Sequence, residues 1–363
     1  MSCGQNMASG PSSEWPLGLV MDEVWLKTRR LLVQALEGLG CWLPGRAHSE
    51  IIQAERRRGN NLAQRVLPTV LGEDYDLLRS EALFGPLNQR FRRKLPMALS
   101  FGASLANYFE ALQGQGAVDR QSTIADLCGI FNLGISIFDV VVDEDPRLAQ
   151  TLLQVFDAAT LDRLIASDDS SIGLRSRGDT IPAAEVRILL RIIAWVFAEL
   201  HALEGLDGRR RIALHLRDAY RAERATAVAG ALPRQIDMVR TKSTLPIVII
   251  SELALMKSGP SEAVETVIHA VAETFWPVDD LADLVRDFRK GHVNSILLAD
   301  PCDGPATPAS QVLCRILDGP QLPQIVSKIY DSMRTCERFA ADNQGAGRQF
   351  LQFLLAYVRD WLQ

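Results

Sequence analysis

The stretch TIADLCGIFNLGISIFDVVVDE, residues 123–144, decides the fold class of this chain. When it is drawn as a helix, its apolar residues cover nearly the whole circumference, which is typical of a helix at the centre of a globular core. This apolar stretch also carries Asp139 and Asp143 near its end. Because residues four apart lie on the same face of a helix, the two carboxylates should project side by side. The stretch therefore predicts a charged site at one end of a helical core.

The remainder of the chain is also predicted to be helical. Apolar residues recur at spacings of three and four from residue 21 onward, and no run alternates polar and apolar residues over the length of a strand. Residues 1–19 are rich in Gly, Ser and Pro and are expected to be a mobile leader, followed by a single all-α domain over residues 20–363. Breaks between helices are expected near residues 113–120, 167–181, 204–210, 257–260 and 299–308.

Composition excludes several classes of function. A chain of 363 residues that is 47% apolar can bury a sizeable core. Its net charge is only −5, and its basic runs at residues 55–58, 90–94 and 209–211 are interpreted as solvated helix faces, so no nucleic-acid partner is expected. The six cysteines form no C-x-x-C pair, which predicts a reduced, cytoplasmic setting. The most apolar stretches, 127–142 and 245–256, are shorter than a bilayer span, so no integral membrane segment is expected.

A second long apolar segment, residues 261–290, also ends in acidic residues. Within its sequence DDLADLVRD, the acids Asp279, Asp283 and Asp287 are spaced four and four apart and form a stripe along two helical turns. Burying like charges together is costly unless a cation offsets them. Oxygen ligands without nearby His or Cys favour Mg²⁺, which commonly completes its shell with substrate phosphates. The two acidic clusters therefore predict a Mg²⁺ site for a phosphorylated substrate.

The stripe at 279–287 resembles the second metal motif of class I terpenoid synthases. In that family an Asn or Asp, a Ser, Thr or Asp four on, and a Glu or Asp four further on bind Mg²⁺, with a basic residue just before the last acid, here Arg286. The following RKGHVN, residues 289–294, is similar to the basic stretch and Gly-x-x-Asn tail of the family. The family's first motif is an aspartate-rich D-D-x-x-D. Here FDVVVDE, residues 138–144, lacks the doubled Asp and looks like the D-x-x-x-D form of squalene and phytoene synthases.

The resemblance also implies which cations bind the diphosphate. The sequence MVRTKSTLP, residues 238–246, resembles the broken helix that carries a diphosphate-sensing Arg in bacterial terpene synthases. Arg240 and Lys242 are therefore implied to contact diphosphate together with Arg286, and Arg234 is another candidate for the sensor. Mg²⁺ is implied to be held on two walls of one cavity, by Asp139 and Asp143 on one and by Asp279, Asp283 and Asp287 on the other.

The fold and activity implied are those of a class I terpenoid synthase, an α-helical bundle around a central cavity. Such an enzyme, a carbon–oxygen lyase, ionises a linear prenyl diphosphate, here farnesyl or geranylgeranyl, and cyclises the carbocation while diphosphate leaves. Aromatic residues could line the cavity or simply belong to the core; the candidates are Phe131, Phe138, Trp195, Phe275 and Trp276. The segment 300–308 is either a lid or a surface loop.

Two other functions stay open. One is a prenyltransferase in the same fold, either like squalene and phytoene synthases or chain-elongating, and the other is a non-catalytic helical partner subunit. The resemblance also implies a homodimer. A second prenyl substrate would distinguish a prenyltransferase, and replacing Asp139 or Asp283 by Asn should abolish the turnover of either enzyme without unfolding it.

Overall fold

All regular elements in the described part of the chain are helices. The computed structural model describes residues 17–39, 43–80, 83, 88–114, 122–144, 183–227, 234–290, 293–298, 309–343 and 345–361. No strand occurs within these ranges, so the predicted all-α class is confirmed. The elements are α1 (Leu17–Glu37), α2 (Gly45–Arg65), α3 (Leu67–Leu71), the 3₁₀-helix η2 (Gly72–Arg79), α4 (Asn88–Leu112), α5 (Thr123–Glu144), α8 (Ala184–Ala227), α9 (Arg234–Ala254), α10 (Glu262–Lys290), α11 (Ser295–Leu298), α12 (Ala309–Asp318), α13 (Gln321–Asp342) and α14 (Ala346–Trp361).

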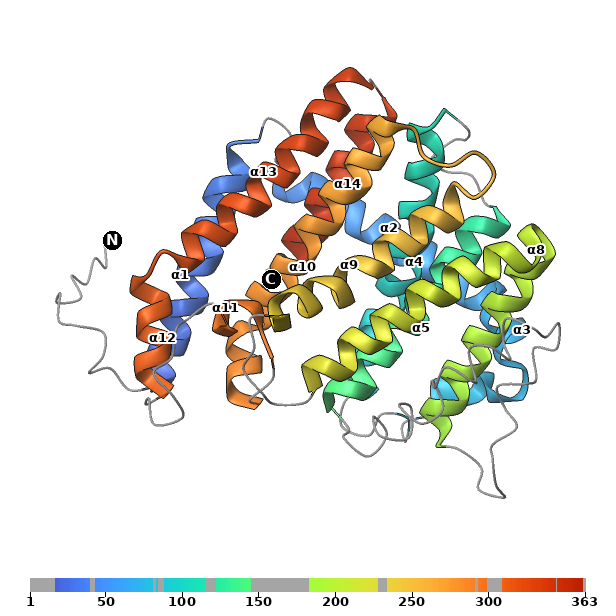
Figure 1. The fold of residues 1–363 in the computed structure, drawn as a ribbon, viewed down its shortest axis with the longest axis horizontal. Helices are drawn as coiled ribbons and strands as arrows, with labels where there is room; N and C mark the ends of the chain where they lie inside the picture. Colours follow the sequence, from blue (N-terminus) through green and yellow to red (C-terminus); the bar gives the residue numbers. More distant parts are fainter. Residues whose placement is uncertain are drawn as a thin grey trace.

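Helix α5 is the central helix that its sequence predicts. It packs against α4, α8 and α9 (Figure 1), and Leu127, Ile130, Leu133 and Ile137 along it are fully buried. Neighbours on three sides explain why its apolar residues surround the helix and do not form one stripe. Helix α4 runs antiparallel to α5, because the side-chain amide of Asn132 donates to the carbonyl oxygen of Ala98 at 2.8 Å while residues further along α4 meet the start of α5. The beginning of α4 and the end of α5 therefore lie together.

Glycines allow these central helices to cross closely. A Cβ atom placed on Gly102 of α4 would come within 2.3 Å of the carbonyl oxygen of Cys128 on α5. A Cβ atom on Gly129 would likewise approach the carbonyl oxygen of Leu99 to 2.7 Å. Both contacts are with backbone atoms, which cannot rotate away as a side chain can. A residue larger than Gly at either position would have to push α4 and α5 apart.

Helix α10 connects this central group to the remaining helices. It packs against α9 on one side and against α13 and α14 on the other, while α1, α12 and α13 lie together at one end of the molecule (Figure 1). Ser261 begins α10 as its N-cap, since its hydroxyl accepts a hydrogen bond from the backbone N–H of Val264 at 3.4 Å. Pro277 lies inside α10, and the helix continues past it to Lys290.

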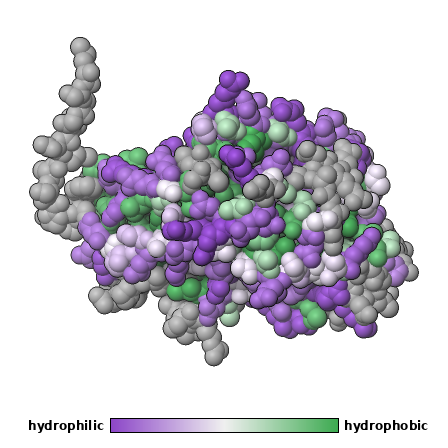
Figure 2. Space-filling view, turned by 90° about the horizontal axis from the view of Figure 1, so that it is seen from above, coloured by the Kyte–Doolittle hydropathy of each residue, from purple (hydrophilic) through white to green (hydrophobic). Residues whose placement is uncertain are grey.

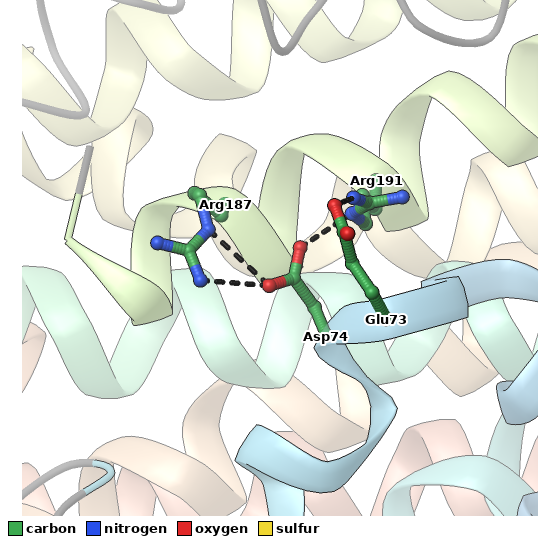
Figure 3. Close-up of polar contacts among 4 residues, drawn as sticks. All are labelled: Glu73, Asp74, Arg187 and Arg191. Carbon is green, nitrogen blue, oxygen red and sulfur yellow. Dashed lines mark hydrogen bonds and ion pairs between the residues drawn. The ribbon is translucent and has the colours of Figure 1, made fainter. Parts of the chain in front are cut away.

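An ion-pair cluster fixes the start of α8 against η2 (Figure 3). Asp74 of η2 is almost completely buried and accepts hydrogen bonds from Arg187, at 2.7 Å, and from Arg191, while Arg191 also donates to Glu73 at 2.7 Å. Burial alone would raise the pKa of Asp74, but the hydrogen bonds from the two guanidinium groups outweigh it and the pKa is lowered. This carboxylate is therefore held in its charged form, with cations already beside it.

Two of the expected helix boundaries are wrong. Helix α8 continues through the expected break at 204–210, past Gly205. A glycine costs a helix only about 1 kcal/mol, and burial of Leu200 and Ile212 on either side offsets that cost. The expected interruption at Pro246 is absent too, because α9 runs continuously from Arg234 to Ala254.

Among the other expected helix boundaries, one is confirmed, one is shifted, and two lie outside the described residues. The break at 257–260 separates α9 from α10 and is confirmed. Helix α1 begins at Leu17, so the last three residues of the expected leader are helical, whereas residues 1–16 lie outside the described residues. The expected breaks at 167–181 and 299–308 lie outside them as well, and with the latter the candidate lid.

One described helix is long and apolar enough to cross a membrane, judged by length and composition alone. It is the stretch Thr123–Val142 of α5, so the expectation that no such segment reaches this length is wrong. More than half of the stretch, 56%, is buried inside the molecule, as expected for a core helix. The face shown in Figure 2 displays polar side chains with apolar patches between them.

Candidate active site

A cavity of about 640 Å³ lies among α4, α5, α8, α9, α10 and α14. Much of its wall is apolar and includes side chains from four of these helices, namely Phe101, Phe131, Ile135, Leu189, Ile192 and Phe275. Charged residues follow these apolar ones toward the end of α5, the end of α10 and the start of α4. An apolar cavity that carries a charged group at one end suits a ligand with an apolar body and a polar head.

The acidic residues of the two predicted clusters meet at this cavity. Asp139 of α5 and Asp279, Asp283 and Asp287 of α10 all line its wall. The side chain of Asp143, in the last turn of α5, lies outside the described part of the chain. The structure thus brings together four of the five predicted metal ligands, although Asp139 is 140 residues from Asp279 in sequence.

The acids of the cavity repel one another. Burial raises the pKa of Asp279 well above its usual value, and repulsion from Asp283 and Asp139 adds to this shift. Asp279 is exposed at the cavity whose wall it lines. Burial also raises the pKa of Asp283, against the opposing charge of Arg286. A cation in the cavity would favour the charged form of both groups.

A further acid of the stripe connects α10 to the chain that follows it. Asp280 is buried and accepts hydrogen bonds from the backbone N–H of Ser295, at 3.1 Å, and from its hydroxyl. Burial raises the pKa of Asp280 to about 6, although the bonds from Ser295 oppose the shift. The side-chain amide of Asn294 donates to the carbonyl oxygen of Asp280 at 2.8 Å and to Asp287 Oδ2 at 3.0 Å. Ser295 was not identified from the sequence, whereas Asn294 ends the Gly-x-x-Asn tail.

The predicted cations separate into two groups. Arg286 lines the cavity and donates to Asp283 Oδ2 at 2.6 Å. Lys242 lines it as well, and its charge opposes the rise in the pKa of Asp279 and of Asp280. Arg240 does not line the cavity. Its Nε donates to Glu273 Oε1 at 2.7 Å and its side chain is 52% exposed, so this placement gives no support to a role in binding diphosphate.

The remaining predicted site residues are Arg234 and the five aromatic residues proposed for the cavity wall. The side chain of Arg234 lies outside the described residues. Of the five candidate wall aromatics, four line the cavity and Trp195 does not. Tyr357 and Trp361 of α14 also line it, although the sequence did not single them out; the ring of Trp361 packs edge-on against Phe275, with centroids 5.0 Å apart.

The interpretation of the basic runs as solvated helix faces is incomplete. Arg93 and Lys94 at the start of α4, and Arg56 on α2, are exposed but line the cavity. A sequence signal for Lys94 was available. It lies three residues after Phe91 and seven before Phe101, so it shares the α4 stripe that faces the apolar cavity.

The donor set of the cavity fits a hard divalent cation. Among the described residues, no three His, Cys, Asp or Glu side chains converge closely enough to hold a metal ion by themselves. Mg²⁺ does not need such a cage, because it binds through one or two carboxylates and takes waters and substrate phosphates as its other ligands. The separated, mutually repelling carboxylates of this cavity are compatible with that mode of binding.

Comparisons with known proteins find only distant similarity. No protein-family model matches the chain, and no curated protein matches its sequence. Two structures of linalool/nerolidol synthase from Streptomyces clavuligerus are similar to it. One has 14% identity and a TM-score of 0.44 over 79% of this chain and 93% of that chain. The other, in complex with 2-fluorogeranyl diphosphate, has 13% identity and a TM-score of 0.45 over 82% and 98%. Similarity this low establishes neither the activity nor the substrate of this chain.

Proposed function

We propose that this chain is a Mg²⁺-dependent class I terpene synthase that ionises a linear prenyl diphosphate, farnesyl or geranylgeranyl, and cyclises the resulting carbocation. The observation that carries the proposal is the meeting of Asp139 with the α10 acids at one apolar cavity. Its volume of about 640 Å³ falls within the range of about 300–1,000 Å³ usual for small-molecule sites. A site that combines hard anionic ligands with a dry apolar wall suits a substrate with a diphosphate head and a hydrocarbon tail.

The residues of the cavity have distinct roles in this proposal. Asp139, Asp143 and the stripe Asp279, Asp283 and Asp287 would hold Mg²⁺, which when bound supplies charge neutralisation for a diphosphate leaving group. Arg286 and Lys242 would bind the diphosphate oxygens and stabilise the charge that develops as the C–O bond breaks. No protein nucleophile is required.

The apolar walls would then protect the carbocation. Phe131, Phe138, Phe275 and Trp276 line the cavity and can offer aromatic faces to a cation, while the surrounding aliphatic side chains exclude water. Water exclusion matters because an allylic cation that meets water is captured as an alcohol before it can cyclise.

Product analysis tests the proposal. The purified protein is incubated with Mg²⁺ and geranyl, farnesyl or geranylgeranyl diphosphate, each alone, and the products are identified by gas chromatography and mass spectrometry. We expect a terpene product and released diphosphate from at least one single substrate, and neither in the presence of EDTA. Absence of diphosphate release from all three substrates would contradict the proposal.

Prenyl coupling is the second candidate, because Asp139 and Asp143 form a D-x-x-x-D pair like that of squalene and phytoene synthases. Adding isopentenyl diphosphate to the same incubations distinguishes elongation, and a product with twice the carbon number of a single substrate indicates head-to-head coupling. We also predict a cytoplasmic setting and a homodimer. Analytical ultracentrifugation would test the homodimer by measuring the mass of the protein in solution.

A further inference from the structure

Lys94 lies at the charged end of an apolar stripe on α4, just as the acidic clusters lie at the charged ends of apolar stripes on α5 and α10. On α5 and α10, an apolar stripe that lines the cavity ends in carboxylates. On α4, the stripe that contains Phe101 and Ala98 leads to Lys94, which also lines the cavity. Because the start of α4 lies beside the end of α5, Lys94 is brought to the same end of the cavity as Asp139.

Lys94 is also close to the α10 stripe. Its positive charge opposes the rise in the pKa of Asp283, as does that of Arg286, which bonds to Asp283 directly. Lys94 nevertheless makes no hydrogen bond and no ion pair with any residue in the described ranges. An ammonium group that faces a cavity with no protein partner is available for an anionic ligand.

Arg240 provides the contrast. The sequence resemblance assigns it to the diphosphate, but its guanidinium already has a carboxylate partner in Glu273 and lies off the cavity wall. A cation that is already neutralised has less to gain from a phosphate than one that is not. The cavity wall therefore carries Lys94 of α4 in addition to Lys242 of α9, whereas Arg240 of α9 lies off it.

We propose that Lys94 binds the diphosphate group of the substrate directly, from the α4 wall of the cavity. This inference rests on the proposed function and adds a binding residue to it. Lys94 supplies a charged hydrogen bond to a terminal phosphate oxygen, while the α10 acids act through the metal.

Calorimetric titration with inorganic diphosphate at saturating Mg²⁺ tests the inference. We expect Lys94→Met to weaken diphosphate binding about 10- to 100-fold, the range for loss of a charged hydrogen bond. Lys94→Arg should restore most of the affinity because it keeps the charge. Arg57→Met is the matched control, since Arg57 is exposed, carries the same charge and is not on the cavity wall. It should change the affinity by no more than about two-fold.

A titration with Mg²⁺ alone separates direct contact from an effect through Asp283. If Lys94 acts only on that carboxylate, Lys94→Met will change Mg²⁺ binding and leave the affinity for diphosphate at saturating Mg²⁺ unchanged, which would overturn the inference. A wild-type affinity retained by Lys94→Met in both titrations would overturn it too. In either case the wild-type protein still binds diphosphate and the proposed function survives. If the wild-type protein itself binds no diphosphate, both proposals are overturned.

Discussion

Two groups of acidic residues in this protein have opposite surroundings. Asp74 of η2 lies between the guanidinium groups of Arg187 and Arg191, and its pKa is lowered (Figure 3). Asp279 and Asp283 lie one turn apart on α10, on the wall of the cavity that Asp139 also lines, and burial together with repulsion among these acids raises the pKa of Asp279. Burial opposes ionisation in both groups, and Asp283 has Arg286 beside it, so the difference is whether the cations within the protein outweigh burial and repulsion.

The contrast distinguishes acidic residues that stabilise the fold from acidic residues suited to binding a cationic ligand. A carboxylate that is paired within the chain contributes to stability, whereas a carboxylate that repels its neighbours reduces stability until a cation arrives. Perturbed groups of the second kind gather at functional sites. Substitution in one group should therefore change stability without activity, and substitution in the other should do the reverse.

The largest effect is expected from Asp283→Asn. Turnover of the prenyl diphosphate should fall roughly 10³-fold, which corresponds to about 4 kcal/mol of transition-state stabilisation, because one metal ligand is lost. The melting temperature of the metal-free protein should change little, because the relief of repulsion from the neighbouring acids offsets the lost ion pair with Arg286. Asp331→Asn, at an exposed position of α13, is the control and should change neither quantity. Retained turnover in Asp283→Asn would remove the assignment of this carboxylate.

Ligand-linked stability is the next largest expected effect. Mg²⁺ and inorganic diphosphate, each at about one hundred times its dissociation constant, should stabilise the wild-type protein by about 2.7 kcal/mol or more. Differential scanning calorimetry would show this as a rise in melting temperature, and the rise should be much smaller in Asp283→Asn. No rise in the wild-type protein would instead favour a non-catalytic partner subunit.

Asp74→Asn should have the opposite effect to Asp283→Asn, lowering stability without lowering turnover. Loss of the charged partner of two arginines is expected to destabilise the fold by about 2 kcal/mol, measured as a lower urea midpoint with an unchanged slope. Turnover should change by no more than about two-fold at a temperature where the protein stays folded. Glu73→Gln is the matched control in the same cluster; because Glu73 is 85% exposed, it should cost less than about 1 kcal/mol. Equal losses in both variants would contradict the role given to burial.

The smallest expected effect is the pH dependence of the stability difference between the wild-type protein and Asp74→Asn. The pKa of Asp74 is lower in the folded protein than its ordinary value of 3.8, so the unfolded chain binds the proton more readily. Its contribution to stability is therefore present above pH 3.8 and is lost as the pH falls through the folded pKa. The gap in unfolding free energy between wild type and Asp74→Asn should stay constant from about pH 7 to 5 and shrink below pH 3.8. A gap that narrows already near neutral pH would point to another group.

Local sequence patterns predicted the helices and the acidic clusters. Features that depend on partners distant in sequence could not be predicted in this way. Helix α5 spans residues 123–144 as expected, because its apolar period and its acidic end are both local signals. The pairing of Arg240 with Glu273, 33 residues away, leaves no local trace, so the sequence could not remove Arg240 from the site.

Exposure was the other property that local sequence could not resolve. The spacing of Lys94 from Phe91 and Phe101 places it on an apolar stripe, but only the packing of α4 against α5 shows that this stripe faces a cavity. The continuous course of α8 past Gly205 has a similar origin, since buried contacts on either side override a weak local preference.

The glycine contacts between α4 and α5 restrict how such a cavity can be re-engineered. With Gly102 and Gly129 against backbone atoms, these two helices form a single stiff wall whose spacing cannot be tuned by substitution. The contact between α5 and α8 differs, because a Cβ atom on Gly134 of α5 would meet only side-chain methyl groups, those of Ile192 and Leu189 on α8. Directed evolution toward longer or shorter prenyl chains should therefore accumulate its changes on α8 and leave the α4–α5 seam untouched.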